Sequence, residues 1–224
     1  MFAVDRTILE RIAETGFRPN TVFDVGAATG LWTLNALTVF DSARYEMFEP
    51  LAGVNPAFAD GLAAATRFAN VRLHRLAIGA RPHAAGFQHD VEGAADLGQP
   101  AVMVSVEPLD ALVASGRVDA PEIIRMDIRS GVLAALVGAQ DRCLPHAHLL
   151  ALRLCMTRRH GGHTPLLSEV CEYLLREDYF PYEFGVKNRD EDGLLIMLDV
   201  WFVRRGSALG KLVWQGRLNR PGAA

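Results

Sequence analysis

Three acidic residues occupy similar places in three separate apolar runs. Asp24, Glu49 and Asp127 each lie at or near the carboxyl end of a short segment with the composition of a buried strand. Ligands of open α/β sheets bind outside the carboxyl ends of the strands, so we expect these side chains to line one crevice. A carboxylate there can accept hydrogen bonds from ligand hydroxyl groups or remove a proton from one. The three acids therefore point to a binding or catalytic site.

A turn of small residues follows the first of these segments. Its two glycines allow a tight bend and close approach to a ligand, and the helix expected over 31–40 adds unpaired N–H groups. A dinucleotide-binding turn reads G-x-G-x-x-G, but here three residues separate the glycines. The missing middle glycine disfavours a pyrophosphate and suits S-adenosylmethionine, which carries an amino-acid moiety and no phosphate. An ordinary strand–turn–helix joint is the alternative. The expected cofactor contacts are Asp24, Gly26, Ala27, Ala28 and Gly30.

Glu49 strengthens the cofactor hypothesis by its position. It lies roughly 20 residues past the glycine turn, where a ribose-binding acid is expected in this type of fold. A carboxylate there can accept hydrogen bonds from both ribose hydroxyls and so fix the adenosine half of the ligand. The alternative is a solvated loop acid.

The elements that must position these residues alternate between strand and helix, which predicts an α/β fold. The last two strands should form an antiparallel pair at the sheet edge. The segment 79–100 is expected to be a loop with at most one short hairpin at 85–89. Strands are expected over 21–25, 44–48, 71–78, 102–106, 123–128, 148–154, 182–186 and 194–203, and helices over 4–15, 31–40, 56–68, 108–113, 132–142 and 166–176.

Length and composition indicate one domain over 21–224, with a helix within 1–20 packed on it. A net charge of -3 gives no electrostatic case for a nucleic-acid partner. The three cysteines are odd in number and lack C-x-x-C spacing, so neither a disulfide framework nor a zinc site is expected. Charged residues near the start and the lack of a long apolar run predict no signal peptide, no membrane span and a cytoplasmic location.

With strands and acids placed, the chain resembles the FkbM family of S-adenosylmethionine-dependent methyltransferases over about 21–205. The resemblance implies the class I, Rossmann-like methyltransferase fold: a seven-stranded, mostly parallel sheet with an antiparallel C-terminal hairpin and helices on both faces. It also implies S-adenosyl-L-methionine as cofactor, with Leu76 and Ala77 among its contacts. Usually the family transfers a methyl group to an oxygen of a sugar, polysaccharide or polyketide-like acceptor. The matching segments are 23–30, Phe48-Glu49-Pro50, Leu76-Ala77-Ile78-Gly79, Pro108-Leu109-Asp110, Ile124-Arg125-Met126-Asp127, Leu136 with Gly138-Ala139, and 199–205.

The chain departs from the family pattern at two places. After the strand-four aspartate the family usually shows Glu or Gln, then Gly, then Glu, where this chain has Arg129, Ser130 and Val132. The family commonly has a Glu in its fifth strand, and this chain has Arg153 at that position. Opposite charge would reverse the effect on the pKa of an acceptor hydroxyl, so the family's catalytic groups are not carried over there.

Two hypotheses on function follow. The first is an O-methyltransferase acting on a small-molecule or glycan hydroxyl, and the second is a catalytically degenerate FkbM-like protein with a binding or regulatory role. An NAD-linked oxidoreductase does not fit, because the middle glycine is missing.

Asp127 is the first candidate for a base or acceptor-orienting group in the first hypothesis. The loop after the strand 148–154 supplies His160 and His163 as further catalytic candidates. These histidines lack a nearby acidic partner in the sequence, so metal binding is not expected. An anionic acceptor, such as a sugar acid or phosphorylated sugar, would fit a set of arginines; alternatively, these cap the sheet or pair with local acids. They are Arg129, Arg153, Arg158 and Arg159.

Overall fold

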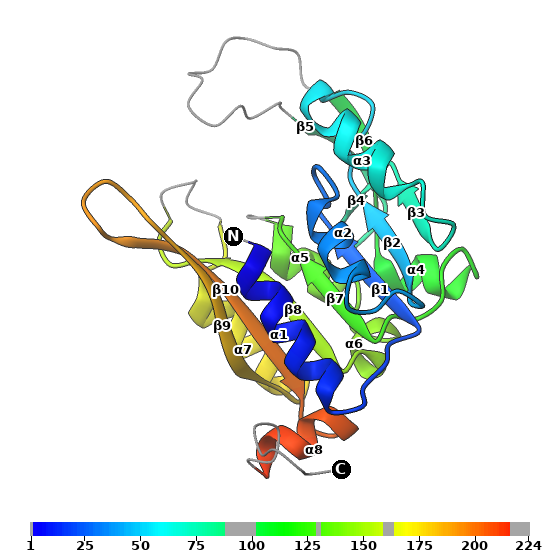
Figure 1. The fold of residues 1–224 in the computed structure, drawn as a ribbon. Coiled ribbons are helices and arrows are strands. Elements are labelled where there is room, and N and C mark those ends of the chain that lie inside the picture. Colours follow the sequence, from blue (N-terminus) through cyan, green and yellow to red (C-terminus); the bar gives the residue numbers. More distant parts are fainter. Residues whose placement is uncertain (1, 88–101, 129–130, 159–163, 216–224) are drawn as a thin grey trace.

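The computed structural model describes residues 2–87, 102–128, 131–158 and 164–215. Its centre is a seven-stranded sheet with the order β3-β2-β1-β7-β8-β10-β9 (Figure 1). The pairs from β3 to β8 are parallel, whereas β10 is antiparallel to both β8 and β9. This confirms the mostly parallel sheet with an antiparallel C-terminal hairpin. The strands are β1 (Thr21–Val25), β2 (Arg44–Phe48), β3 (Val71–His74), β7 (Ile123–Met126), β8 (Leu149–Cys155), β9 (Tyr179–Arg189) and β10 (Leu195–Arg204).

Helices cover both faces of the sheet, because successive side chains of a buried strand point to opposite faces. In β1, Val22 packs into one core cluster and Phe23 into the other. The first cluster receives side chains from α1 (Phe2–Glu14), α2 (Leu31–Leu37), α3 (Ala59–Ala65) and α8 (Ala208–Trp214), and a 3-10 turn (Pro56–Phe58) precedes α3. The second receives them from α4 (Leu109–Ala114), α5 (Val132–Val137), α6 (Cys143–His146) and α7 (Leu167–Arg176).

One predicted strand is divided in the structure. The expected strand 71–78 is interrupted after His74, and its second half, β4 (Ala77–Ile78), joins a separate three-stranded sheet. There β6 (Val102–Glu107) lies between β4 and β5 (His83–Phe87). An alternating pattern identifies a strand but not its pairing partner, which explains the difference. The expected hairpin at 85–89 is instead the pairing of β5 with β6, and residues 88–101 lie outside the described residues.

The predicted helices lie where the structure has helices, but the residues at which they begin and end differ. The expected helix 132–142 ends at Val137, and the separate short helix α6 follows. The C-terminal helix α8 was not expected from the sequence. Across the described ranges, no helix has both the length and the apolar character needed to span a membrane.

Three of the segments that resemble the FkbM family pack against one another, and none of them contains one of the three acids. They are the segments 76–79, 108–110 and 136–139. A Cβ on Gly138 would overlap the Gly79 carbonyl oxygen, and Asp110 N donates to the Gly138 carbonyl at 2.9 Å. The Asp110 carboxylate accepts three backbone N–H bonds, which lead the chain into α6. Their donors and lengths are Asp141 at 2.7 Å, Arg142 at 3.1 Å and Cys143 at 2.9 Å. Packing accounts for these motif positions.

We expect Asp110→Ala to lower the free energy of unfolding by about 2–3 kcal/mol, because hydrogen bonds to a charged group contribute more than neutral ones. Urea unfolding measures this loss. The control is Asp119→Ala, which breaks an exposed ion pair with Arg44 and should cost less than about 1 kcal/mol. Equal losses in the two variants would contradict the role given to Asp110.

Candidate functional site

The glycine turn is clamped between the ends of β2 and β7. Gly26 has φ +77°, and its N–H donates to the Phe48 carbonyl at 2.9 Å. A Cβ on Gly26 would overlap the Asp127 carbonyl oxygen and lie 2.7 Å from Ile128 Cγ2. Gly30, with φ +72°, ends the turn at the start of α2. The backbone of the turn therefore fits against β7 only with glycine at position 26.

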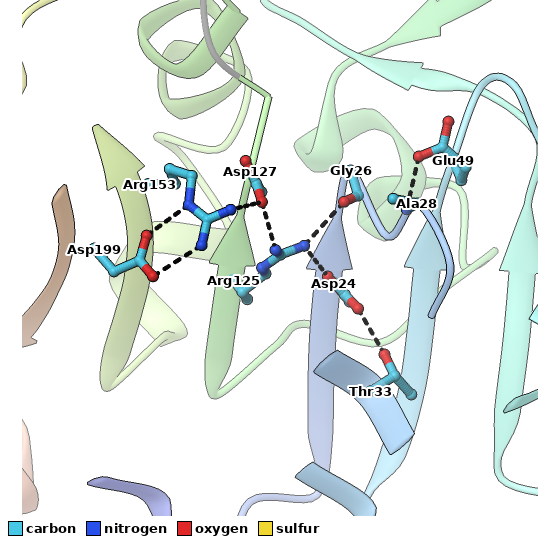
Figure 2. Close-up of polar contacts among 9 residues, drawn as sticks. All are labelled: Asp24, Gly26, Ala28, Thr33, Glu49, Arg125, Asp127, Arg153 and Asp199. Carbon is cyan, nitrogen blue, oxygen red and sulfur yellow. Dashed lines mark hydrogen bonds and ion pairs between the residues drawn. The ribbon is translucent and has the colours of Figure 1, made fainter. Parts of the chain in front are cut away.

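Glu49 lies beside this turn at the end of β2. Its Oε2 accepts the Ala28 N–H at 2.8 Å (Figure 2). Its Oε1 accepts the Leu51 N–H at 2.9 Å. The residue is only 5% exposed, and burial raises the pKa of its carboxyl group. Each oxygen keeps a second lone pair, so the oriented carboxylate can accept two more hydrogen bonds. This geometry does not support the alternative of a solvated loop acid.

Asp24 is fully buried and holds the turn from beneath. Its Oδ2 accepts the Thr33 hydroxyl at 2.7 Å, and its Oδ1 accepts Arg125 Nη1 at 2.9 Å. The same Nη1 donates to the Gly26 carbonyl at 2.9 Å. The structure thus joins Asp24 to the glycine turn through Arg125, while Glu49 contacts the turn at Ala28 (Figure 2). The Asp24 side chain acts on the turn through its neighbours.

Asp127 is held between two guanidinium groups. Its Oδ2 accepts Arg125 Nη2 at 2.8 Å and Arg153 Nη1 at 2.9 Å. Its Oδ1 has no hydrogen-bond partner among the described residues, and the side chain is partly exposed. Arg153 continues to Asp199, with Nε to Oδ1 at 2.7 Å and Nη2 to Oδ2 at 3.0 Å. A charge ladder, Asp24–Arg125–Asp127–Arg153–Asp199, thus crosses four neighbouring strands (Figure 2).

The sequence left open whether Arg153 binds an anionic acceptor or pairs with local acids. The structure shows that it pairs with Asp127 and Asp199. Asp199 was not among the predicted site residues. Its partnership with Arg153 follows from the antiparallel register of β10 on β8, which sets the two residues opposite each other. Burial opposes the charge on both arginines, but the carboxylates around them outweigh it and raise the pKa of Arg125 and of Arg153. Both guanidinium groups therefore stay charged.

Of the remaining predicted site residues, three lie in the described ranges and four lie outside them. Leu76 is buried in the core with Phe48, and Ala77 is buried against β6. Arg158 donates to Glu169 Oε1 at 2.6 Å and to the Thr164 carbonyl at 3.0 Å. Outside the described residues lie Arg129, Arg159, His160 and His163.

Comparisons with known proteins bear on the fold. No protein-family model matches the sequence, and no curated protein matches it. Methyltransferase FkbM from Methylobacillus flagellatus KT superposes with a TM-score of 0.54 and 22% identity, over 81% of this chain and 43% of that one. The chain has the class I methyltransferase fold. It spans less than half the length of the Methylobacillus protein.

Two further structures share the fold at lower identity. A SAM dependent methyltransferase from Agrobacterium tumefaciens has a TM-score of 0.55 and 13% identity, over 90% of this chain and 61% of that one. Magnesium protoporphyrin IX methyltransferase (ChlM) from Synechocystis PCC 6803, with bound SAM, has a TM-score of 0.51 and 9% identity, over 90% of this chain and 78% of that one.

In this class I fold, the crevice outside the carboxyl ends of β1, β2 and β7 is where the general rule for open α/β sheets places a ligand. Glu49, the glycine turn and Asp127 all lie at that edge (Figure 2). Within the described ranges no group of three or more His, Cys, Asp or Glu side chains could hold a metal ion.

Proposed function

We propose that the chain is an S-adenosylmethionine-dependent O-methyltransferase that acts on a hydroxyl group of a small molecule or glycan. The observation that carries the proposal is Glu49, oriented by Ala28 N–H and Leu51 N–H beside a turn that closes only with glycine at position 26. In this proposal residues 21–224 form the catalytic domain, and the helix within 1–20 packs on it.

The residues of the site fit this cofactor better than a dinucleotide. Glu49 keeps free lone pairs for two ribose hydroxyls. Arg125, the cation joined to the turn, is already committed to Asp24 and Asp127, so it offers no charge to a pyrophosphate. A cofactor without phosphate matches that charge balance.

When bound, the cofactor supplies an electrophilic methyl group on its sulfonium sulfur. Asp127 then has two tasks, to orient the acceptor hydroxyl and to accept its proton at Oδ1. Arg125 and Arg153 fix the direction of Oδ1 by holding Oδ2. We keep His160 and His163 as further acid–base candidates.

We expect Glu49→Ala to weaken the binding of S-adenosylmethionine and S-adenosylhomocysteine at least about tenfold, or about 1.4 kcal/mol. The variant loses the ribose contacts and the bond that orients Ala28. Titration calorimetry on the purified chain measures the change, with the exposed Glu10→Ala as control. No binding of either compound to the wild type would overturn the methyltransferase proposal.

A second candidate function is binding without turnover. It is favoured by the commitment of Asp127 Oδ2 to two guanidinium groups, one of them Arg153, where the family commonly has Glu. Turnover with any member of a hydroxyl acceptor panel, lost in Asp127→Ala, supports the enzyme; cofactor binding without turnover across the panel supports this second candidate.

The described arginines do not favour an anionic acceptor. Arg153 is neutralised by Asp127 and Asp199, and Arg158 is paired with Glu169. An anionic sugar as acceptor therefore stays a prediction that rests on Arg129 and Arg159.

A further inference from the structure

His74 is the last residue of β3, the strand that lies beside β2 at one edge of the seven-stranded sheet (Figure 1). The register of the two strands sets His74 opposite Phe48, so Glu46 lies diagonally across from it on the same face. His74 Nε2 donates to Glu46 Oε2 at 2.7 Å. The imidazole ring is stacked on the Phe48 ring, with centroids 4.9 Å apart and an interplanar angle of 18°. One imidazole thus contacts two residues of β2.

Glu46 anchors the imidazole because it is a carboxylate inside the sheet. The residue is only 3% exposed, and a buried charge is costly unless it is paired and hydrogen-bonded. Arg72 is a second cation nearby, but its Nη1 lies 4.0 Å from Glu46 Oε1, beyond hydrogen-bond distance, and its side chain is 70% exposed. The short hydrogen bond to this carboxylate comes from His74, so the bond fixes the orientation of the ring.

Phe48 connects the imidazole to the glycine turn. Its side chain is fully buried and contacts the Phe23 ring edge-on at 5.3 Å as well as the ring of His74. Its carbonyl accepts the Gly26 N–H at 2.9 Å and the Ala27 N–H at 3.2 Å. The position of the turn therefore depends on where the end of β2 is held, and His74 is one of the residues that hold it.

Glu49, the next residue after Phe48, is also bonded to His74. Its N–H donates to the His74 carbonyl at 3.0 Å, and its carboxylate accepts the Ala28 N–H at 2.8 Å. A shift at the end of β2 would move the Cα of Glu49 and break the hydrogen bond that orients its carboxylate. His74 therefore acts on Glu49 in two ways, directly through its own carbonyl and indirectly through the ring of Phe48.

We propose that His74 is a positioning residue of the cofactor site. Bonded to Glu46 and stacked on Phe48, it fixes the end of β2 where the Glu49 carboxylate can accept hydrogen bonds from both ribose hydroxyls. It acts through Glu49 and does not itself touch the ligand. The inference rests on the proposed function and extends the cofactor site to β3.

Two substitutions of Glu46 separate the hydrogen bond from the size of the side chain. Glu46→Gln keeps an oxygen that accepts from His74 Nε2, whereas Glu46→Leu has a similar size and no acceptor. We expect both proteins to fold, because an apolar side chain is tolerated in place of a buried charged one. His74→Ala removes the ring itself, and Arg72→Gln, at the exposed neighbour, is the control.

Calorimetric titration with S-adenosylhomocysteine and its analogue without the two ribose hydroxyls measures how well Glu49 is placed. We expect wild type, Glu46→Gln and Arg72→Gln to bind the natural compound at least about tenfold more tightly than the analogue. In Glu46→Leu and His74→Ala this preference should fall below about threefold, with little change in binding of the analogue. A merely structural loss would weaken both compounds equally. The preference retained in either variant, or absent from wild type, would overturn the positioning role.

Hydrogen exchange on the free chain distinguishes failure of this inference from failure of the proposed function. If wild type binds neither compound, the proposed function fails, and exchange at the Ala28 N–H then decides the role of His74 alone. This N–H, bonded to Glu49, should exchange at least about tenfold faster in Glu46→Leu and in His74→Ala than in wild type. The amides of β8 should not change. An unchanged rate at Ala28 would overturn the positioning role.

Discussion

Gly26→Ala is expected to abolish the binding of S-adenosylhomocysteine and to lower the free energy of unfolding by about 2–5 kcal/mol. The new Cβ would overlap the Asp127 carbonyl oxygen and lie 2.7 Å from Ile128 Cγ2. It would also have to be tolerated at φ +77°, which disfavours any residue with a side chain. The turn can relieve this overlap only by moving away from β7, and that movement displaces the Ala28 N–H from Glu49. Calorimetric titration and urea unfolding measure the two effects.

Gly16→Ala is the matched control, because it separates backbone strain from the overlap. Gly16 has φ +84°, but a Cβ there would meet nothing within 4 Å. The control should cost about 1–2 kcal/mol, the cost of the left-handed backbone alone, and leave ligand binding unchanged. If Gly26→Ala behaves like Gly16→Ala in both measurements, the turn is not fixed against β7 in the way described.

The parts of the fold that depend on local pattern follow from the sequence. The run at β1 is short, buried and bounded by a small-residue turn, and its predicted bounds are those observed. The two strand-like segments that become β9 and β10 likewise predict the terminal hairpin, because they follow each other directly in the sequence. Such patterns reflect the two faces of a strand, and they persist whatever the strand pairs with.

The parts that depend on pairing and on packing at a distance do not follow. Asp199 meets Arg153 because of one register among several that the apolar pattern of β10 would allow. Asp24 was expected to line the crevice, yet Thr33 and Arg125 hold it beneath the glycine turn. A carboxylate at a strand end looks the same in sequence whether its partner is a ligand or a buried cation from another strand. Only the arginine in the otherwise apolar segment of β7 could have signalled the difference, since a largely buried charge needs an acidic partner.

Arg125→Met is expected to lower the free energy of unfolding by about 3–5 kcal/mol, the cost of leaving a buried charge without its partner. Asp24, which is fully buried, would keep only the Thr33 hydroxyl, and the Gly26 carbonyl would lose its donor. The Asp127 carboxylate would keep its hydrogen bond from Arg153, so its charge would stay paired. Because the glycine turn is joined to β7 through Arg125, we expect S-adenosylhomocysteine binding to weaken with stability. The surface change Arg44→Met, which breaks an exposed pair with Asp119, should cost less than about 1 kcal/mol.

The double variant Asp24→Asn with Arg125→Met tests whether the loss comes from the unpaired charge or from lost packing. The introduced amide would still accept the Thr33 hydroxyl while carrying no charge, so the double variant should be more stable than Arg125→Met alone. We expect a coupling of about 1–3 kcal/mol between the two positions, measured by urea unfolding of all four proteins of the cycle. Additive losses would mean that packing around the long arginine side chain, rather than its charge, joins β1 to β7. The presence or absence of that coupling therefore decides whether the charge ladder fixes the glycine turn electrostatically or only fills space beneath it.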